Sequence, residues 1–281
     1  MRIIYLLAIS IVLVSCSEKF DSGLDTTSVI VIEGVIIDSD TMPSYVKVSR
    51  SSMDFNDLFS SEVKDALVIV SDDKGQIDTL QFNAAFSNSG AYYTKSFKAK
   101  SNNTYHLYVK VDGEEYMATT FMPPTVEIDS IYIPSNPENL INSKDNVKLF
   151  FNDPAENNYY LFQFNQCCAM NWELSDVNAY YVVNDKFLEP NFAINGYNFE
   201  SSLSVYSNYY NYIDTNGISR LSFAISTLTK ESYEYLHATS LQINNDNGVY
   251  SPTPSSPKGN ISNGALGYFR ASSLSFISSR D

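Results

Sequence analysis

Short apolar runs, rich in Val, Ile, Tyr, Phe and Thr and separated by turn-forming residues, constrain the fold of this chain more than any other feature. Apolar and polar side chains alternate within residues 105–111, as on a strand with one buried and one solvated face. Gly75 and Gly113 follow aspartate-containing turns and supply the positive φ that a hairpin needs. About seven strands within roughly 95 residues predict an immunoglobulin-like β-sandwich. The runs are residues 29–37, 45–49, 66–71, 77–82, 92–97, 105–111 and 116–121.

Pro123 and Pro124 end this succession, because neither can donate a hydrogen bond to a strand ladder. We therefore place a domain boundary here, with the sandwich at residues 28–123 and a second, β-rich domain at residues 124–281. Apolar runs in the second domain occupy residues 128–133, 147–151, 159–166, 179–183 and 221–228. The predicted fold class is mostly β, with a single C-terminal helix.

That helix is predicted at about residues 229–244, ahead of a Gly- and Asn-rich C-terminal segment. Thr229 is a good N-cap and Glu231 lies in the first turn, where an acidic side chain is favourable. A turn-forming sequence at residues 245–248 ends the helix. One apolar stripe is expected along it, formed by Tyr233, Leu236, Ser240 and Leu241.

The N-terminus reads as an export signal. Arg2 precedes an apolar run at residues 3–14, which is too short to span a bilayer as a mature helix. The ending Leu-Val-Ser-Cys resembles the lipobox of bacterial lipoproteins, in which the cysteine is acylated after cleavage. Residues 1–15 are then a signal peptide, Cys16 is the lipidation site and residues 16–27 are a tether. The alternative is an ordinary secretory signal with a chance cysteine.

Composition narrows the classes of function. The chain has 281 residues, 44% hydrophobic and 18% charged, as in a folded globular protein. A net charge of −14 repels phosphate backbones and argues against nucleic-acid binding. Neither histidine, His106 or His237, lies in a catalytic motif, so no enzyme activity is expected. A Ser–His–Asp arrangement assembled from distant residues stays open.

Cys167 and Cys168, followed by Met170 and Trp172, form the most unusual local cluster. Soft sulfur ligands at this spacing suit Cu(I) or a similar ion. On an extended strand, however, the two thiols point to opposite faces, and a disulfide between neighbours is strained. Thiols packed as small hydrophobic side chains are the simpler interpretation. No disulfide framework or cofactor is expected.

Aromatic residues also gather in an Asn- and Ser-rich stretch, a composition typical of adaptable binding surfaces. Such rings stack on a sugar or a peptide, or contact a partner protein. The alternative is that they form the two faces of irregular strands. The candidate contact residues for a ligand or partner are Trp172, Tyr206, Tyr209, Tyr210 and Tyr212.

Several stretches carry a family resemblance. Residues 228–236, 251–254 and 259–269 resemble the closing signature of a lipoprotein family of the Bacteroidota known as domain of unknown function 4249. Residues 31–34, 49–50, 66–73 and 152–154 also resemble its pattern, so the resemblance covers nearly the whole mature chain. Ala265 departs from it, because it interrupts a Gly-Leu-Gly stretch that is usually unbroken. The family has no assigned chemistry, so it transfers no catalytic or ligand-binding residues.

The resemblance also implies a setting, because members are typically encoded beside TonB-dependent outer-membrane receptors. We therefore expect a lipoprotein anchored in the outer membrane that serves as an accessory or ligand-capture subunit of a TonB-dependent nutrient uptake system. The sequence does not decide between the surface-exposed and the periplasmic face of that membrane. Its second domain is the expected contact surface, and its ligand a small nutrient, peptide or glycan. A cell-surface β-sandwich with a structural or adhesive role is the alternative, and an exported hydrolase is the third hypothesis.

Overall fold

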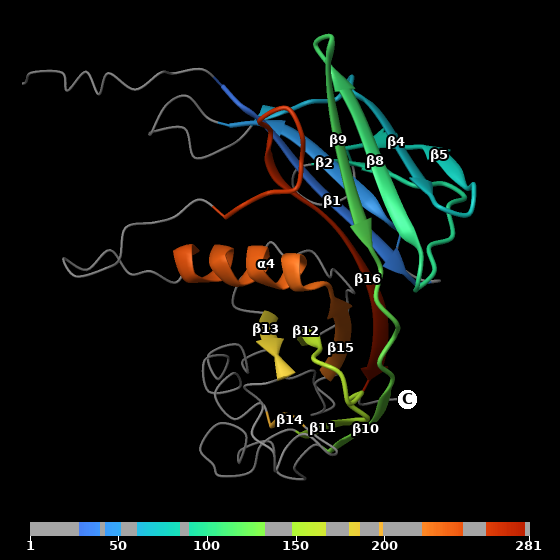
Figure 1. The fold of residues 1–281 in the computed structure, drawn as a ribbon, viewed down its shortest axis with the longest axis vertical. Coiled ribbons are helices and arrows are strands. Elements are labelled where there is room, and N and C mark those ends of the chain that lie inside the picture. The colour runs from blue at the N-terminus through green and yellow to red at the C-terminus, as the bar shows by residue number, and fades with distance from the viewer. Residues whose placement is uncertain are drawn as a thin grey trace, which may run out of the picture.

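The residues that the structure describes form three β-sheets and one helix (Figure 1). The computed structural model describes residues 28–39, 43–51, 61–84, 90–132, 148–166, 180–185, 197–198, 221–243 and 257–278. Among these residues the predicted class is confirmed: mostly β, with one helix near the C-terminus. No described helix is both long and apolar enough to cross a membrane.

Two sheets form the sandwich in the upper part of Figure 1. Sheet B has the strand order β5-β4-β8-β9. It faces part of the nine-stranded sheet A, in which β1 pairs with β2, and β2 with β7 and β3. The bounds are β1 (Ile30–Asp38), β2 (Tyr45–Arg50), β3 (Ser61–Glu62), β4 (Leu67–Asp72), β5 (Ile77–Thr79), β6 (Gln81–Asn83), β7 (Ala91–Tyr93), β8 (Thr104–Val111) and β9 (Glu114–Phe121).

The sandwich core confirms the predicted alternation along β8. Tyr105, Leu107, Val109 and Val111 are buried in one apolar cluster with residues of sheet A, whereas His106 is exposed. The predicted hairpins are also present: Gly75 (φ 93°) and Gly113 (φ 85°) occupy the left-handed region in the β4–β5 and β8–β9 turns. Burial of alternate side chains thus holds the two layers together.

Two predicted strands differ in the structure. The run at residues 77–82 is split at the buried Leu80, so that β5 pairs in sheet B and β6 pairs in sheet A. The run at residues 92–97 contributes only the short β7. Beyond it, the backbone N–H groups of Lys95 and Ser96 donate to the carboxylate of Asp78 and not to a neighbouring strand. A chain that crosses between two sheets cannot continue either ladder.

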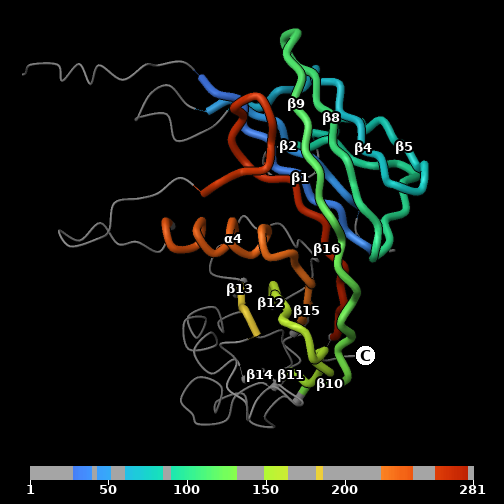
Figure 2. The backbone as a smooth tube through the Cα atoms, viewed as in Figure 1, coloured from blue at the N-terminus to red at the C-terminus, as the bar shows by residue number. Residues whose placement is uncertain are grey.

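The C-terminal strand β16 (Leu266–Ser278) joins the two halves of the chain. Its first part, from Leu266 to Ser273, pairs in parallel with β1, and its last part pairs antiparallel with β15 (Leu221–Leu228). Figure 2 shows β16 running from the sandwich down into the lower sheet. Phe269 and Ala271 are fully buried in the sandwich core. The segment expected to be a Gly- and Asn-rich tail of the second domain therefore also completes the first.

Residues just before β16 hold it in place. The side chain of Asn260 acts as a substitute strand: its Nδ2 donates to the Phe269 carbonyl at 2.7 Å and its Oδ1 accepts from the Phe269 N–H at 2.8 Å. Gly267 has φ 99°, and a Cβ there would lie 2.1 Å from the Ile32 carbonyl oxygen. Ser262 exchanges hydrogen bonds with the backbone of Met117 and so covers the outer edge of β9.

The second half surrounds the other end of sheet A, with the order β13-β12-β15-β16. One face packs on the three-stranded sheet C (β10-β11-β14) through a cluster that includes Phe151, Tyr160, Phe162 and Phe223. The other face packs on the helix α4 through Leu161, Leu228 and Leu236. The remaining bounds are β10 (Ile128–Tyr132), β11 (Lys148–Phe151), β12 (Tyr159–Gln166), β13 (Tyr180–Asn184), β14 (Tyr197–Asn198) and α4 (Lys230–Ile243).

The N-cap of α4 is confirmed, because Thr229 Oγ1 accepts the Ser232 N–H at 3.2 Å. Ser232 and Leu236 are buried, and Tyr235 stacks on Tyr268 of β16 with ring centroids 4.6 Å apart. The predicted place of Leu241 on the same apolar stripe is wrong, because its side chain is 60% exposed. At about 100° per residue, position 241 lies roughly 140° around the helix from Leu236.

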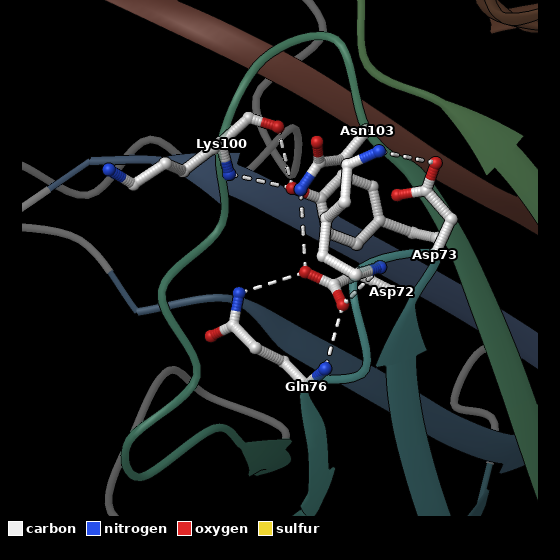
Figure 3. A network of polar contacts seen from close by, with 7 residues as sticks. Asp72, Asp73, Gln76, Lys100 and Asn103 are labelled. Carbon is white, nitrogen blue, oxygen red and sulfur yellow. Dashed lines mark hydrogen bonds and ion pairs between the residues drawn. The ribbon is translucent and has the colours of Figure 1, made fainter.

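A buried carboxylate closes the β4–β5 hairpin (Figure 3). Asp72 is 6% exposed, and its Oδ1 accepts the N–H groups of Lys74 (3.0 Å) and Gln76 (2.8 Å). Its Oδ2 accepts the side-chain amides of Gln76 (2.8 Å) and Asn103 (3.4 Å). Burial alone would raise the pKa of Asp72, but the donors outweigh burial, so the pKa lies below its ordinary value. This network is structural.

We predict that Gly267→Ala destabilises the protein far more than Gly264→Ala. Both positions have positive φ, which costs about 1 kcal/mol for alanine, but a Cβ at Gly264 meets nothing within 4 Å, whereas one at Gly267 meets backbone. The expected loss in the free energy of unfolding is about 1 kcal/mol for Gly264→Ala and about 3 kcal/mol or more for Gly267→Ala. Urea unfolding measures both, and equal losses would contradict the tight approach of β16 to β1.

Asp72→Asn is expected to lower the free energy of unfolding by about 1–3 kcal/mol at pH 7, because the new amide faces two donors at the Oδ2 position. A carboxyl with a lowered pKa stabilises the fold above its unfolded pKa. That contribution disappears as the pH falls through the folded pKa, so the difference between wild type and variant should shrink below about pH 4. Asp73→Asn is the control, because Asp73 is a surface residue whose side chain pairs with exposed Lys74, and its cost should stay within about 0.5 kcal/mol.

Candidate functional surfaces

The predicted site residues lie outside the described part of the chain. This holds for the lipidation site Cys16, for Cys167, Cys168 and Met170, and for the candidate contact residues Trp172, Tyr206, Tyr209, Tyr210 and Tyr212. These assignments stay predictions. The described strands do fix where the intervening segments join the sheet. Gln166 at the end of β12 is the partner of Leu221 at the start of β15, and Gln163 is the partner of Tyr180. Gln166, Tyr180 and Leu221, which adjoin residues 167–179 and 199–220 in the sequence, therefore lie at the same end of sheet A.

Both histidines are exposed, on different elements. His106 lies on β8, where its Nδ1 is 3.1 Å from Thr119 Oγ1. His237 lies on α4 and stacks on Tyr233 with ring centroids 5.5 Å apart; Tyr233 in turn lies 5.0 Å from the ring of Tyr159. These contacts are those of surface packing. The described residues include no group of three or more His, Cys, Asp or Glu side chains that could hold a metal ion.

The outer face of sheet B carries exposed apolar side chains among polar ones, which include Ser71, Thr79, His106 and Thr119. Ile69, Tyr108 and Met117 are direct neighbours across β4, β8 and β9. Six large exposed hydrophobic side chains are found among the described residues, and four of them lie on this face. We define the apolar face as Leu67 (43% exposed), Ile77 (72%), Met117 (53%) and Phe121 (42%), together with the half-buried Ile69 and Tyr108.

Charges on the apolar face neutralise one another. Lys110 Nζ lies 3.0 Å from Glu115 Oε1, and the Tyr108 hydroxyl also hydrogen-bonds Glu115. The bond from Lys110 is the main reason that the pKa of Glu115 lies below its ordinary value. A sequence signal for this face exists in the run Leu67-Val68-Ile69-Val70, which is apolar on both sides of the strand.

Two carboxylates lie beside a buried tyrosine in the second half. The hydroxyl of Tyr160 donates to Asp153 Oδ1, and the Asn158 N–H donates to Asp185 Oδ2 at 2.7 Å. Asp185 Oδ1 is buried and accepts no hydrogen bond from the residues that the structure describes. Burial raises the pKa of Asp153. The Tyr160 hydrogen bond lowers it, the charge of Asp185 raises it, and the resulting pKa is above its ordinary value. Burial, followed by the hydrogen bond to Asp153 and the charge of that carboxylate, raises the pKa of Tyr160.

We predict that Asp153→Asn stabilises the protein at pH 8 and does so less at pH 5. The amide still accepts the Tyr160 hydroxyl, but it removes a charge that burial disfavours. A carboxyl with a raised pKa binds more protons in the folded state, so its contribution to the free energy of unfolding falls as the pH rises from about 4 through the folded pKa. Urea unfolding at both pH values tests this, with the exposed Asp129→Asn as control. Equal destabilisation at both pH values would argue against it.

Comparisons with known proteins identify the family. No curated protein matches the chain. A solved structure of a DUF4785 family protein from Legionella pneumophila is similar over 70% of this chain, with 13% identity and a TM-score of 0.23; the match covers 52% of that structure, so this chain spans about half its length. The model of the family described as "Domain of unknown function (DUF4249)" matches residues 17–275. The chain therefore belongs to the DUF4249 family.

Proposed function

We propose that this protein is a lipid-anchored accessory and ligand-capture subunit of a TonB-dependent outer-membrane nutrient uptake system. The observation that carries the proposal is the family match over residues 17–275, because the resemblance to this family implies genes beside TonB-dependent receptors. The match begins directly after Cys16, the cysteine of the lipobox-like sequence.

The order of parts along the chain supports an anchored role. An apolar export signal comes first, the acylated cysteine second, and the described fold begins at Ser28. Two or three acyl chains anchor a protein stably, whereas one binds only marginally. A fold held by large apolar cores needs no further support from the membrane.

Ligand capture is assigned to the second half of the chain. The predicted contact residues Trp172, Tyr206, Tyr209, Tyr210 and Tyr212 belong to segments that join the same end of sheet A. Aromatic rings among Asn and Ser side chains suit a nutrient with both apolar and polar surfaces, such as a peptide or glycan. The adhesive or structural role requires the same anchor and fold but no receptor.

A mild-detergent pull-down from the native outer membrane is the test, with partners identified by mass spectrometry. We expect wild-type protein to recover a TonB-dependent receptor in near-equal amount. Cys16→Ala is the matched control, because it removes the acylation site, which lies outside the described fold. This variant should be released into the soluble fraction and should carry no acyl chains.

Two results would contradict the proposal. Recovery of wild-type protein alone, from membranes that contain the receptor, would favour the structural or independent-binder role. Membrane association of Cys16→Ala equal to that of wild type would show that the lipobox interpretation is wrong. Turnover that is lost on replacing His106 or His237 would favour an exported hydrolase instead.

A further inference from the structure

We propose that the connection between the two halves of the chain is a clasp and not a hinge, so that the halves keep one orientation and unfold together. The clasp consists of residues 122–128 and of three buried hydroxyl side chains that hold them, those of Thr227, Ser273 and Ser275. Linkers between domains are usually exposed, and the domains that they join usually move relative to each other. This inference goes beyond the proposed function, because it concerns the motion of the fold and requires no ligand or receptor.

The two ends of the connection are buried in different cores. Met122 is fully buried in the sandwich core; its N–H donates to the Asn103 carbonyl at 3.0 Å, and its carbonyl accepts the Asn102 N–H at 2.8 Å. Val126 is 5% exposed and belongs to the core between sheets A and C. The four residue steps between these side chains span at most about 14 Å. A change in the angle between the halves would therefore pull one of them out of its core.

Two hydroxyl side chains fasten the middle of the connection. Thr227 Oγ1 on β15 donates to the Pro124 carbonyl at 2.8 Å, and the same oxygen is hydrogen-bonded to Ser273 Oγ on β16. Thr227 is 5% exposed and Ser273 is 1% exposed, so both hydroxyls are shielded from competing water. The proline turn that marks the boundary in the sequence is thus bonded to the sheet that it passes.

A third hydroxyl fastens the far end. Ser275 Oγ on β16 accepts the Ile128 N–H at 2.9 Å and donates to Glu127 Oε2 at 3.0 Å. Ser275 is 5% exposed. One side chain therefore holds both the backbone that starts β10 and the side chain just before it.

The clasp lies where β16 passes from one half to the other. Ser273 is the last residue of β16 that pairs with β1, opposite Asp38, and Leu274 is the first that pairs with β15, opposite Ser226. The chain therefore crosses between the halves twice at the same level, and Figure 2 shows the two crossings side by side. A hinge needs a few residues that are free to change φ and ψ. Two crossings that are bonded to each other resist both rotation and separation.

The complete chain is tested in a urea titration, with pulsed hydrogen exchange read by mass spectrometry. The amides of β8 give the unfolding midpoint of the sandwich, and those of β12 give that of the second half. Val109→Ala and Phe162→Leu each remove buried volume from one core only. We expect each variant to lower both midpoints equally, by about 1 M urea. Ile77→Ala, at a 72% exposed position, is the control and should leave both unchanged.

A second set of variants tests the hydroxyls. Thr227→Val combined with Ser275→Ala removes the bonds to Pro124, Glu127 and Ile128. In this background, the shift that Val109→Ala causes in the β12 midpoint should fall to less than about half of its original size, because the halves are then less strongly coupled. Ser130→Ala removes an exposed hydroxyl of β10 and is the matched control, with no loss of coupling expected.

Each result supports or overturns the clasp. If Val109→Ala lowers only the β8 midpoint and Phe162→Leu only the β12 midpoint, the halves are independent domains and the connection is a hinge. If the shift passes from one half to the other equally with and without the hydroxyls, the coupling belongs to β16 alone and the clasp is wrong. Should the double variant not fold, Ser275→Ala alone is measured in the same way.

Discussion

The pairing of β16 with β1 is the contact on which the rest of the structure depends. One strand supplies buried residues to the sandwich, a neighbour to β15 and a stacking surface for α4. Its position relies on close backbone approach at Gly267 and on the Asn260 side chain, which occupies the place of a missing strand. The two halves are therefore joined by a shared ladder and not only by the chain near Pro123.

Local patterns were sufficient to predict much of this fold, since alternation, turn glycines and an N-cap are properties of neighbouring residues. Tyr105 to Val111 and Thr229 were predictable for that reason. β16 was not, because its sequence is rich in Ser and its partner β1 lies more than 200 residues away. The split at Leu80 depends on which sheet each neighbour joins, which no local run encodes. The exposure of Leu241, in contrast, follows from helical periodicity, because position 241 lies about 140° around the helix from the buried Leu236.

The candidate functional features also fall into two groups: those visible in a local run of sequence and those that form only when the chain folds. Cys16 was identified by its position after an apolar run, a purely sequential signal. The apolar face needed the structure, because Leu67, Ile77, Met117 and Phe121 come from three strands and share a surface only after the sheet has formed. Asp72 and Asp153 show the same limit for electrostatics. Both are partly or fully buried aspartates, but four donors surround one and a second carboxylate adjoins the other, so their pKa values move in opposite directions.

The parallel pairing of β1 with β16, the first and last described strands, also constrains the order in which the chain folds. Synthesis proceeds from the N-terminus, so β1 emerges long before the residues that pair with it. Until β16 arrives, one side of β1 has no ladder and the sandwich core lacks Phe269 and Ala271. The paired residues lie more than 200 positions apart, so closure of this contact is slow in principle. A chain with this connectivity leaves the ribosome with its sandwich incomplete, and the sandwich closes only when β16 has joined β1.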